Sequence, residues 1–100
     1  MRSRYAAYAL GHVSHIMNTT HPDGPHHQDA RGPWHDQIQA FCEAVSFVGL
    51  TIHGSDHNDA RGWVEFTAHL TQATEDASFT ERSLFLRDRG RWLYHSAVSD

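Results

Sequence analysis

The residues most able to do chemistry gather in one run, THPDGPHHQDARGPWH, at positions 20–35. A metal site there would need three or four side chains converging at about 2 Å from the ion. His26 and His27 are adjacent, so their rings point apart in an extended loop. His21, His26 and His35 are therefore weak candidate ligands, and their spacing matches no HExxH motif. We interpret the run mainly as surface histidines and keep weak metal binding as an alternative.

Two glutamates lie inside segments that alternate like strands, Glu65 in WVEFT and Glu81 in FTERSLF. A carboxyl group buried in a pocket has a raised pKa unless it is paired, and it can then act as a general acid or base. The other interpretation is a structural ion pair with Arg2, Arg4 or Arg82. We favour the ion pair and keep the pocket role as the alternative.

Other side chains join these as pocket candidates. The full set is Arg4, Tyr8, Glu65, Glu81, Tyr94 and His95. His95 could form a histidine–carboxylate pair with Glu81 or Glu65 on neighbouring strands, but no serine or cysteine lies in a nucleophile elbow beside them. The sequence also contains no glycine-rich phosphate loop. We therefore assign no catalytic residue and no cofactor, and a binding role is favoured over an enzymatic one.

The first half of the chain predicts helices. MRSRYAAYALG spaces its apolar residues by three to four and ends at a glycine, which is typical of a helix and its stop. HVSHIMNTT continues with Val13, Ile16 and Met17 on one face. Residues 21–33 hold all three prolines and predict a loop. PWHDQIQAFCEAVS again has helical spacing, and Pro33 is expected to open this third helix.

The second half predicts antiparallel strands. SFVGLTIHG has alternating apolar residues at Val48, Leu50 and Ile52. GWVEFTAHLT, ASFTERSLFLRD and GRWLYHSAV alternate in the same way, and RDRG is expected to form a hairpin turn between the last two. Helices over about 1–46 followed by a sheet over about 47–98 predict one α+β domain, residues 1–100, with the helices packed on one face of a curved sheet.

Composition limits the classes of partner. The formal charge is −4 at pH 7, and nonspecific nucleic-acid binding needs a basic surface, so we expect no nucleic-acid partner. No apolar run approaches the roughly 20 residues of a membrane span, and no signal peptide is recognisable. We therefore expect no membrane partner and a cytoplasmic location. The single cysteine, Cys42, lies in a helical pattern and is expected to be a buried apolar residue.

Several segments together resemble the middle domain of the YchJ family. They are MRSRYAAYALG, the pair His21-Pro22, FVGLTI, GWVEFTAHL, ERSLFL and GRWLYH, in the family's order across nearly the whole chain. The resemblance implies a nuclear transport factor 2-like (cystatin-like) α+β cone, in which a bent sheet wraps around the helices. It implies no assigned activity.

Many members of that family flank this domain with cysteine-rich SEC-C segments expected to bind zinc. The chain holds no such cysteines, so we expect a single-domain relative or the middle domain alone, and we carry over no zinc role. The sequence thus predicts a non-enzymatic binding or interaction module, with a homodimer formed through the exposed face of the sheet. The alternative is a domain that binds an unknown small molecule, or an isomerase- or hydrolase-type enzyme, with a carboxylate-containing pocket in the cone.

Overall fold

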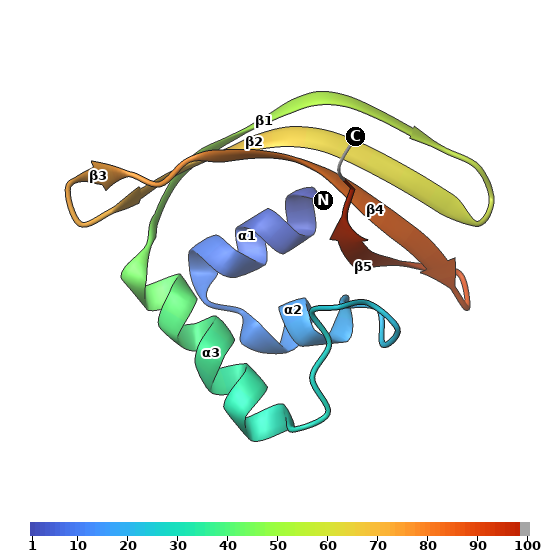
Figure 1. Ribbon diagram of the computed structural model, residues 1–100, viewed down its shortest axis with the longest axis horizontal. Helices are drawn as coiled ribbons and strands as arrows, with labels where there is room; N and C mark the ends of the chain where they lie inside the picture. The colour runs from blue at the N-terminus through green and yellow to red at the C-terminus, as the bar shows by residue number, and fades with distance from the viewer. Residues whose placement is uncertain (99–100) are drawn as a thin grey trace.

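The computed structural model describes residues 1–98 and has three helices followed by five strands in that range (Figure 1). The elements are α1 (Arg2–Leu10), α2 (Val13–Asn18), α3 (Arg31–Ala44), β1 (Ser46–His57), β2 (Arg61–Gln72), β3 (Glu75–Asp76), β4 (Phe79–Asp88) and β5 (Arg91–Ala97). The antiparallel sheet runs in the order β1-β2-β4-β5, and the short β3 pairs with β2. The sheet arches over the helices, which confirms the predicted α+β architecture.

Helix α1 ends where the sequence predicts, at Gly11. This residue has φ 72° and ψ 28°, and its N–H donates to the carbonyl oxygen of Tyr8. Glycine adopts this left-handed conformation without the clash that a Cβ would cause. The chain then turns into α2, whose three apolar residues, Val13, Ile16 and Met17, are buried as expected.

Helix α3 begins earlier than the sequence predicts. Its first residue is Arg31, so Pro33 is the third helical residue and does not open the helix. The first N–H groups of a helix have no acceptor within it, so a proline in the first turn removes no hydrogen bond. The buried face of α3 carries Trp34 and Ile38, as the spacing predicts.

Strand β1 departs from strict alternation at Val48. The pairing of β1 with β2 shifts between Phe47 and Gly49, which inserts one extra residue. Such a bulge shifts by one residue the alternation of side chains between the two faces of the sheet. Val48 is therefore 68% exposed, and the prediction that it shares an inward face with Leu50 and Ile52 is wrong. Phe47, like Leu50 and Ile52, packs against buried residues of β2 such as Phe66 and Leu70 instead.

Two apolar clusters make up most of the core of the described residues, and Phe85, Leu93 and Tyr94 are buried outside them. The helix cluster is Ala7, Val13, Ile16, Met17, Trp34 and Ile38. The sheet cluster is Val45, Phe66, Ala68 and Leu70. Aromatic rings join them at one side, where Phe47 lies 5.8 Å from Tyr5 and 6.2 Å from Tyr8 between ring centroids. Elsewhere the clusters face each other beneath the arch.

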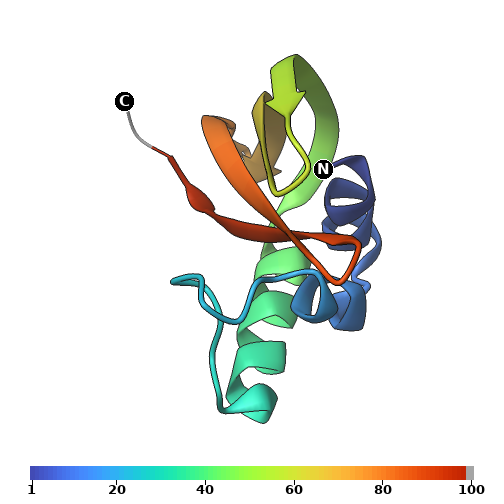
Figure 2. The same cartoon turned by 90° about the vertical axis from the view of Figure 1, so that its right-hand side faces the viewer.

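The C-terminal strand is bound to the segment that follows α2. The N–H of Tyr94 donates to the carbonyl oxygen of Thr19, and the N–H of His21 donates to the carbonyl oxygen of Tyr94, each at 2.7 Å. The loop after α2 consequently passes beneath β5 (Figure 2). The predicted turn between β4 and β5 is confirmed, with positive φ at Arg89 and Gly90. No helix within residues 1–98 is long and apolar enough to cross a membrane.

Candidate ligand-binding cavity

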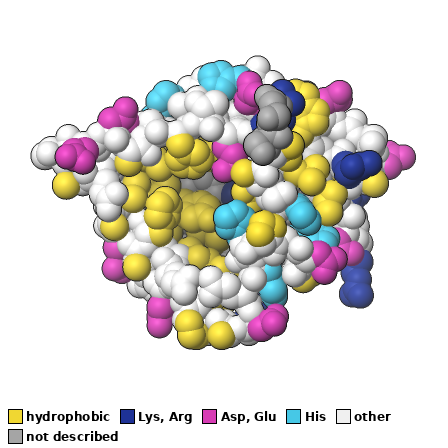
Figure 3. Space-filling view, in the orientation of Figure 1, with side chains coloured by type: hydrophobic (Ala, Val, Ile, Leu, Met, Phe, Trp, Pro, Cys, Tyr) yellow, Lys and Arg dark blue, Asp and Glu magenta, His cyan; other side chains and the backbone are white. Residues whose placement is uncertain are grey.

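A cavity of about 500 Å³ lies between the arched sheet and the helices. It appears in Figure 3 as a central hollow lined mostly by hydrophobic side chains, with an acidic side chain at its upper rim. Its aromatic walls are Tyr5, Tyr8, Trp34, Phe41, Phe47, Phe66, Phe79 and Tyr94. Its polar and charged groups are Arg4, Thr20, His26, Gln28, Gln37, Glu81 and Ser83. A volume and a lining of this kind are typical of small-molecule sites.

The strands position the polar end of the cavity. In the register of β2 with β4, Glu81 lies opposite Phe66 and Ser83 lies opposite Val64. Side chains two residues apart on a strand share a face, so Glu81 and Ser83 both face the cavity. Strand alternation alone places Glu81 and Ser83 on one side of β4, but Ser83 is not among the predicted pocket residues.

The carboxylate of Glu81 accepts two hydrogen bonds on the same oxygen. The hydroxyl of Tyr94 donates to Oε2 over 3.1 Å, and the hydroxyl of Ser83, which is 0% exposed, also donates to Oε2. None of the hydrogen bonds found within residues 1–98 ends on Oε1. Burial, followed by the charge of Glu81, raises the pKa of Tyr94 well above its ordinary value. Tyr94 therefore stays a donor at neutral pH.

Arg4 lies on the helix side of the same polar end and is only 6% exposed. Its Nη1 donates to the carbonyl oxygen of Ile16 at 3.1 Å and to the hydroxyls of Thr19 at 2.8 Å and Thr20 at 3.2 Å. Its Cζ lies 4.7 Å from the ring centroid of Tyr94. Burial lowers the pKa of Arg4, but a guanidinium remains protonated in proteins. The cavity thus has a fixed positive charge beside Tyr94.

Four of the six predicted pocket residues line this cavity. They are Arg4, Tyr8, Glu81 and Tyr94. Tyr8 contributes from α1, where its ring lies 5.8 Å from that of Phe41. Burial raises the pKa of Tyr8. The expectation of an ion pair for Glu81 is not met by a direct contact, because its hydrogen bonds come from Tyr94 and Ser83.

Glu65 lies on the opposite face of the sheet. It is one residue from the buried Phe66, and neighbouring side chains on a strand point to opposite faces. Its Oε2 lies 3.6 Å from Nη2 of Arg82, whose Cζ is 4.6 Å from the ring centroid of Trp63. The hypothesis that Glu65 and Glu81 share one pocket is therefore wrong.

His95 does not line the cavity either. The pairing of β4 with β5 shifts by one residue at this point, because Phe85 pairs with Tyr94 while Leu84 pairs with Ser96. His95 is the extra residue of this bulge. Its Nδ1 lies 2.8 Å from the hydroxyl of Ser96, and the expected histidine–carboxylate pair with Glu81 does not form.

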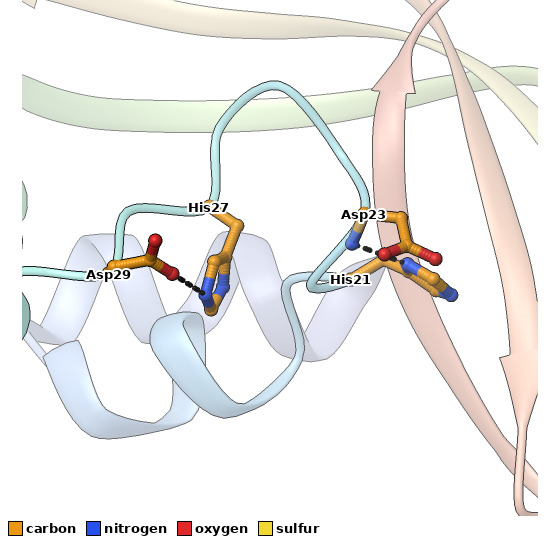
Figure 4. A network of polar contacts seen from close by, with 4 residues as sticks. All are labelled: His21, Asp23, His27 and Asp29. Atoms are coloured by element: carbon orange, nitrogen blue, oxygen red, sulfur yellow. Dashed lines mark hydrogen bonds and ion pairs between the residues drawn. The ribbon is translucent and has the colours of Figure 1, made fainter.

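The candidate metal ligands are not brought together. The weak candidates are His21, His26 and His35. The backbone N–H of Asp23 donates to Nδ1 of His21 at 3.0 Å, and Nε2 of His27 lies 3.6 Å from Oδ1 of Asp29. Figure 4 shows these two pairs at separate places in the loop. Within residues 1–98, no three His, Cys, Asp or Glu side chains are grouped so that they could hold a metal ion.

The histidine loop instead contributes one wall of the cavity. Pro25, His26 and Gln28 line it. Nε2 of Gln28 donates to Oε1 of Gln37 at 2.8 Å, which ties the loop to α3, and the ring of His26 lies 5.6 Å from the ring of Tyr94. Sequence reasoning missed this role because no local pattern shows which element a loop will cross.

Comparison with known proteins agrees with this architecture. A family model described as "YchJ, middle NTF2-like domain" matches residues 1–97. The chain belongs to this family. A UPF0225 protein of Vibrio vulnificus is 35% identical over 94% of this chain and 54% of its own length. A UPF0225 protein of Chromobacterium violaceum is 34% identical over 98% of this chain and 70% of its own length. This YchJ middle domain therefore spans between about half and 70% of the length of these relatives.

Solved structures share the fold. The solution structure of a SEC-C motif containing protein from Rhodopseudomonas palustris is 37% identical, with a TM-score of 0.83, over 100% of this chain and 75% of that one. An LEH-like epoxide hydrolase of M. tuberculosis has a TM-score of 0.65 at 16% identity, over 91% of this chain and 69% of that one. The second likeness shows the fold alone. Together they confirm the predicted nuclear transport factor 2-like fold of the YchJ middle domain.

Proposed function

We propose that this domain is a binding module that holds a small, mainly apolar molecule in the cavity beneath the sheet. The observation that carries the proposal is the open cavity of about 500 Å³ between the two apolar clusters. Ligand pockets are typically concave and mainly apolar, with a few polar groups that fix the orientation of the ligand. Glu81, Tyr94 and Arg4 supply such groups at one end.

The walls favour binding over catalysis. A ligand between Ile38 of α3 and Phe66 of β2 would bury apolar surface on two sides, at about 0.8 kcal/mol for each methylene group. Ser83 is fully buried and donates its hydroxyl to Glu81, so it is not presented to a substrate as a nucleophile. We therefore retain the non-enzymatic interpretation that the sequence favours.

A cavity-filling variant tests the proposal. Ala68 lines the cavity and is 4% exposed, so Ala68→Phe places a ring in the empty volume. N-phenyl-1-naphthylamine is an uncharged probe whose fluorescence rises in apolar sites. We expect saturable binding to the wild type and loss of that binding in Ala68→Phe. Ala6→Phe, the same substitution at an exposed position of α1, should bind as the wild type does.

Overpacking can also unfold a domain, so circular dichroism must show that Ala68→Phe is folded; if it is not, Ala68→Leu provides a smaller filling. A folded filled variant that binds the probe with wild-type affinity contradicts the proposal. So does a wild type without saturable binding.

A homodimer through the outer face of the sheet and a cytoplasmic location remain predictions. Sedimentation over a concentration series tests the first, and a strict monomer at high concentration would remove it.

A further inference from the structure

We infer that the cavity selects an uncharged, planar aromatic molecule that donates one hydrogen bond, from a hydroxyl or an N–H group, to the carboxylate of Glu81. This inference rests on the proposed function, because it names the class of ligand that the cavity takes. It depends on three features of the described residues: which hydrogen-bonding atoms are already in use, how the charges balance, and what the walls are made of.

The hydrogen-bonding atoms at the polar end favour a donor. Tyr94 and Ser83 each have one hydroxyl hydrogen, and both donate to Oε2 of Glu81. Oε1 accepts no hydrogen bond from residues 1–98, and an ionised carboxylate is an acceptor only. A ligand that covers Glu81 without donating would leave this oxygen without solvent or partner, which is costly. A donating ligand avoids that cost.

The charges at the polar end are balanced. Arg4 and Glu81 both line the cavity, and Tyr94 contacts both, through its ring with the guanidinium and through its hydroxyl with the carboxylate. With histidines neutral, the side chains of the lining carry one positive formal charge, on Arg4, and one negative formal charge, on Glu81. A cationic ligand would add an unbalanced charge beside Arg4, and an anionic one would approach Glu81. Because burying an unpaired charge is expensive, an uncharged ligand fits best.

The walls favour an aromatic ring. Phe66 lies 6.0 Å from Phe79 with the rings at 73°, and Tyr8 lies 5.8 Å from Phe41 with the rings at 84°. Rings set at such angles present both faces and edges to the space between them. A planar aromatic ligand can then make stacked and edge-to-face contacts at the same time, which adds to the gain from burial alone.

A matched series of naphthalene compounds tests the inference by calorimetry at neutral pH. The compounds are 2-naphthol, 2-methoxynaphthalene, 2-naphthoate and 2-(aminomethyl)naphthalene, which share one ring system and differ in the polar group. A hydrogen bond to a charged group corresponds to roughly a tenfold to hundredfold change in affinity. We therefore expect 2-naphthol to bind at least about tenfold more tightly than the methoxy compound, and more tightly than both charged compounds.

Glu81→Gln gives the decisive comparison. Its amide oxygen can keep the two bonds from Ser83 and Tyr94, and its NH₂ group then replaces the open acceptor with a donor. The preference for naphthol over methoxynaphthalene should fall to about one or reverse. Glu65→Gln, the same substitution on the outer face, should leave the preference unchanged.

The outcomes separate the two proposals. If none of the four compounds binds, and the probe does not bind either, the cavity is not a ligand site and the proposed function fails. If all four bind with similar affinity, or if 2-naphthoate binds most tightly, the cavity is a ligand site but the inferred ligand class is wrong. An unchanged preference in Glu81→Gln, shown to be folded by its thermal unfolding, also overturns the inference.

Discussion

Replacement of Arg4 by methionine tests whether a buried guanidinium joins the helices to the sheet. The substitution keeps an unbranched apolar stem of helix-favouring type but removes three donated hydrogen bonds and the contact with the ring of Tyr94. One of the three acceptors keeps a donor in the variant, because the hydroxyl of Thr20 also donates to the carbonyl oxygen of Ile16 at 2.7 Å. The loss is therefore smaller than three full hydrogen bonds.

The expected magnitude follows from these contacts. One hydrogen bond from a charged donor contributes about 1.5–3 kcal/mol, and a partly desolvated cation–π contact about 0.5–2 kcal/mol. Removal of Arg4 also leaves Glu81 as an unbalanced charge in the cavity. The substitution also removes the desolvation cost of the guanidinium, which is large because Arg4 is only 6% exposed. This relief offsets part of the loss in stability. We expect a net loss of about 2–4 kcal/mol in the free energy of unfolding.

Urea unfolding followed by tryptophan fluorescence measures this loss, with the denaturant slope expected to stay unchanged. Arg2→Met is the matched control, since Arg2 is exposed on the same helix, and it should change the free energy of unfolding by less than about 0.5 kcal/mol. A loss below that value for Arg4→Met would refute the reasoning. An equal loss in the two variants would do so as well, because it would reflect the helix and not the buried contacts.

Two further predictions concern the loop and the titration of the cavity. Gly24→Ala should lower the free energy of unfolding by about 1–3 kcal/mol, because a Cβ at this position would collide with the carbonyl oxygen of His95. The control Gly32→Ala places its Cβ in open space and should not destabilise the domain. Equal urea midpoints for the two variants would contradict this prediction. Burial and the charge of Glu81 raise the pKa of Tyr94 above the ordinary tyrosine value of about 10 in the folded state. Its contribution to stability is therefore complete below about pH 10 and declines as the pH rises further. Unfolding measured across alkaline pH should therefore show a shallower decline in Tyr94→Phe than in the wild type, and an identical slope would exclude this cause.

Strand alternation could be predicted where the ladder is regular, and not where it is interrupted. On β4 the pattern placed Glu81 and Ser83 on one face, and the register confirms that placement. On β1 and β5 a bulge shifts the pattern by one residue, so Val48 and His95 do not lie where alternation predicts. A bulge depends on how two strands pair. Gly49, beside the shift on β1, is a weak local signal because a glycine within a strand often marks a bulge, whereas no glycine lies next to His95 on β5.

The two strand glutamates show the same limit at the site. Glu65 and Glu81 both have apolar neighbours in sequence, which suggests burial for each. On β2, however, both faces carry large side chains, because Phe66 points into the cavity while Trp63 packs against Arg82 on the outside. Apolar neighbours therefore indicate a covered position but not which layer covers it, and only the position of the helices makes the face of Glu81 the inner one.

The cavity itself could not be predicted, for a related reason. The helical spacing of Trp34 and Ile38 requires a buried face, and the helix cluster satisfies that requirement while it meets the sheet cluster only at one side, through the rings of Tyr8 and Phe47. Apolar content is the same whether two such clusters merge or leave a space, so composition and periodicity cannot distinguish a filled cone from a hollow one. A ligand that fills the space adds contacts between the clusters that the chain alone does not make. Its binding must then stabilise the folded domain in proportion to the logarithm of its concentration relative to the dissociation constant.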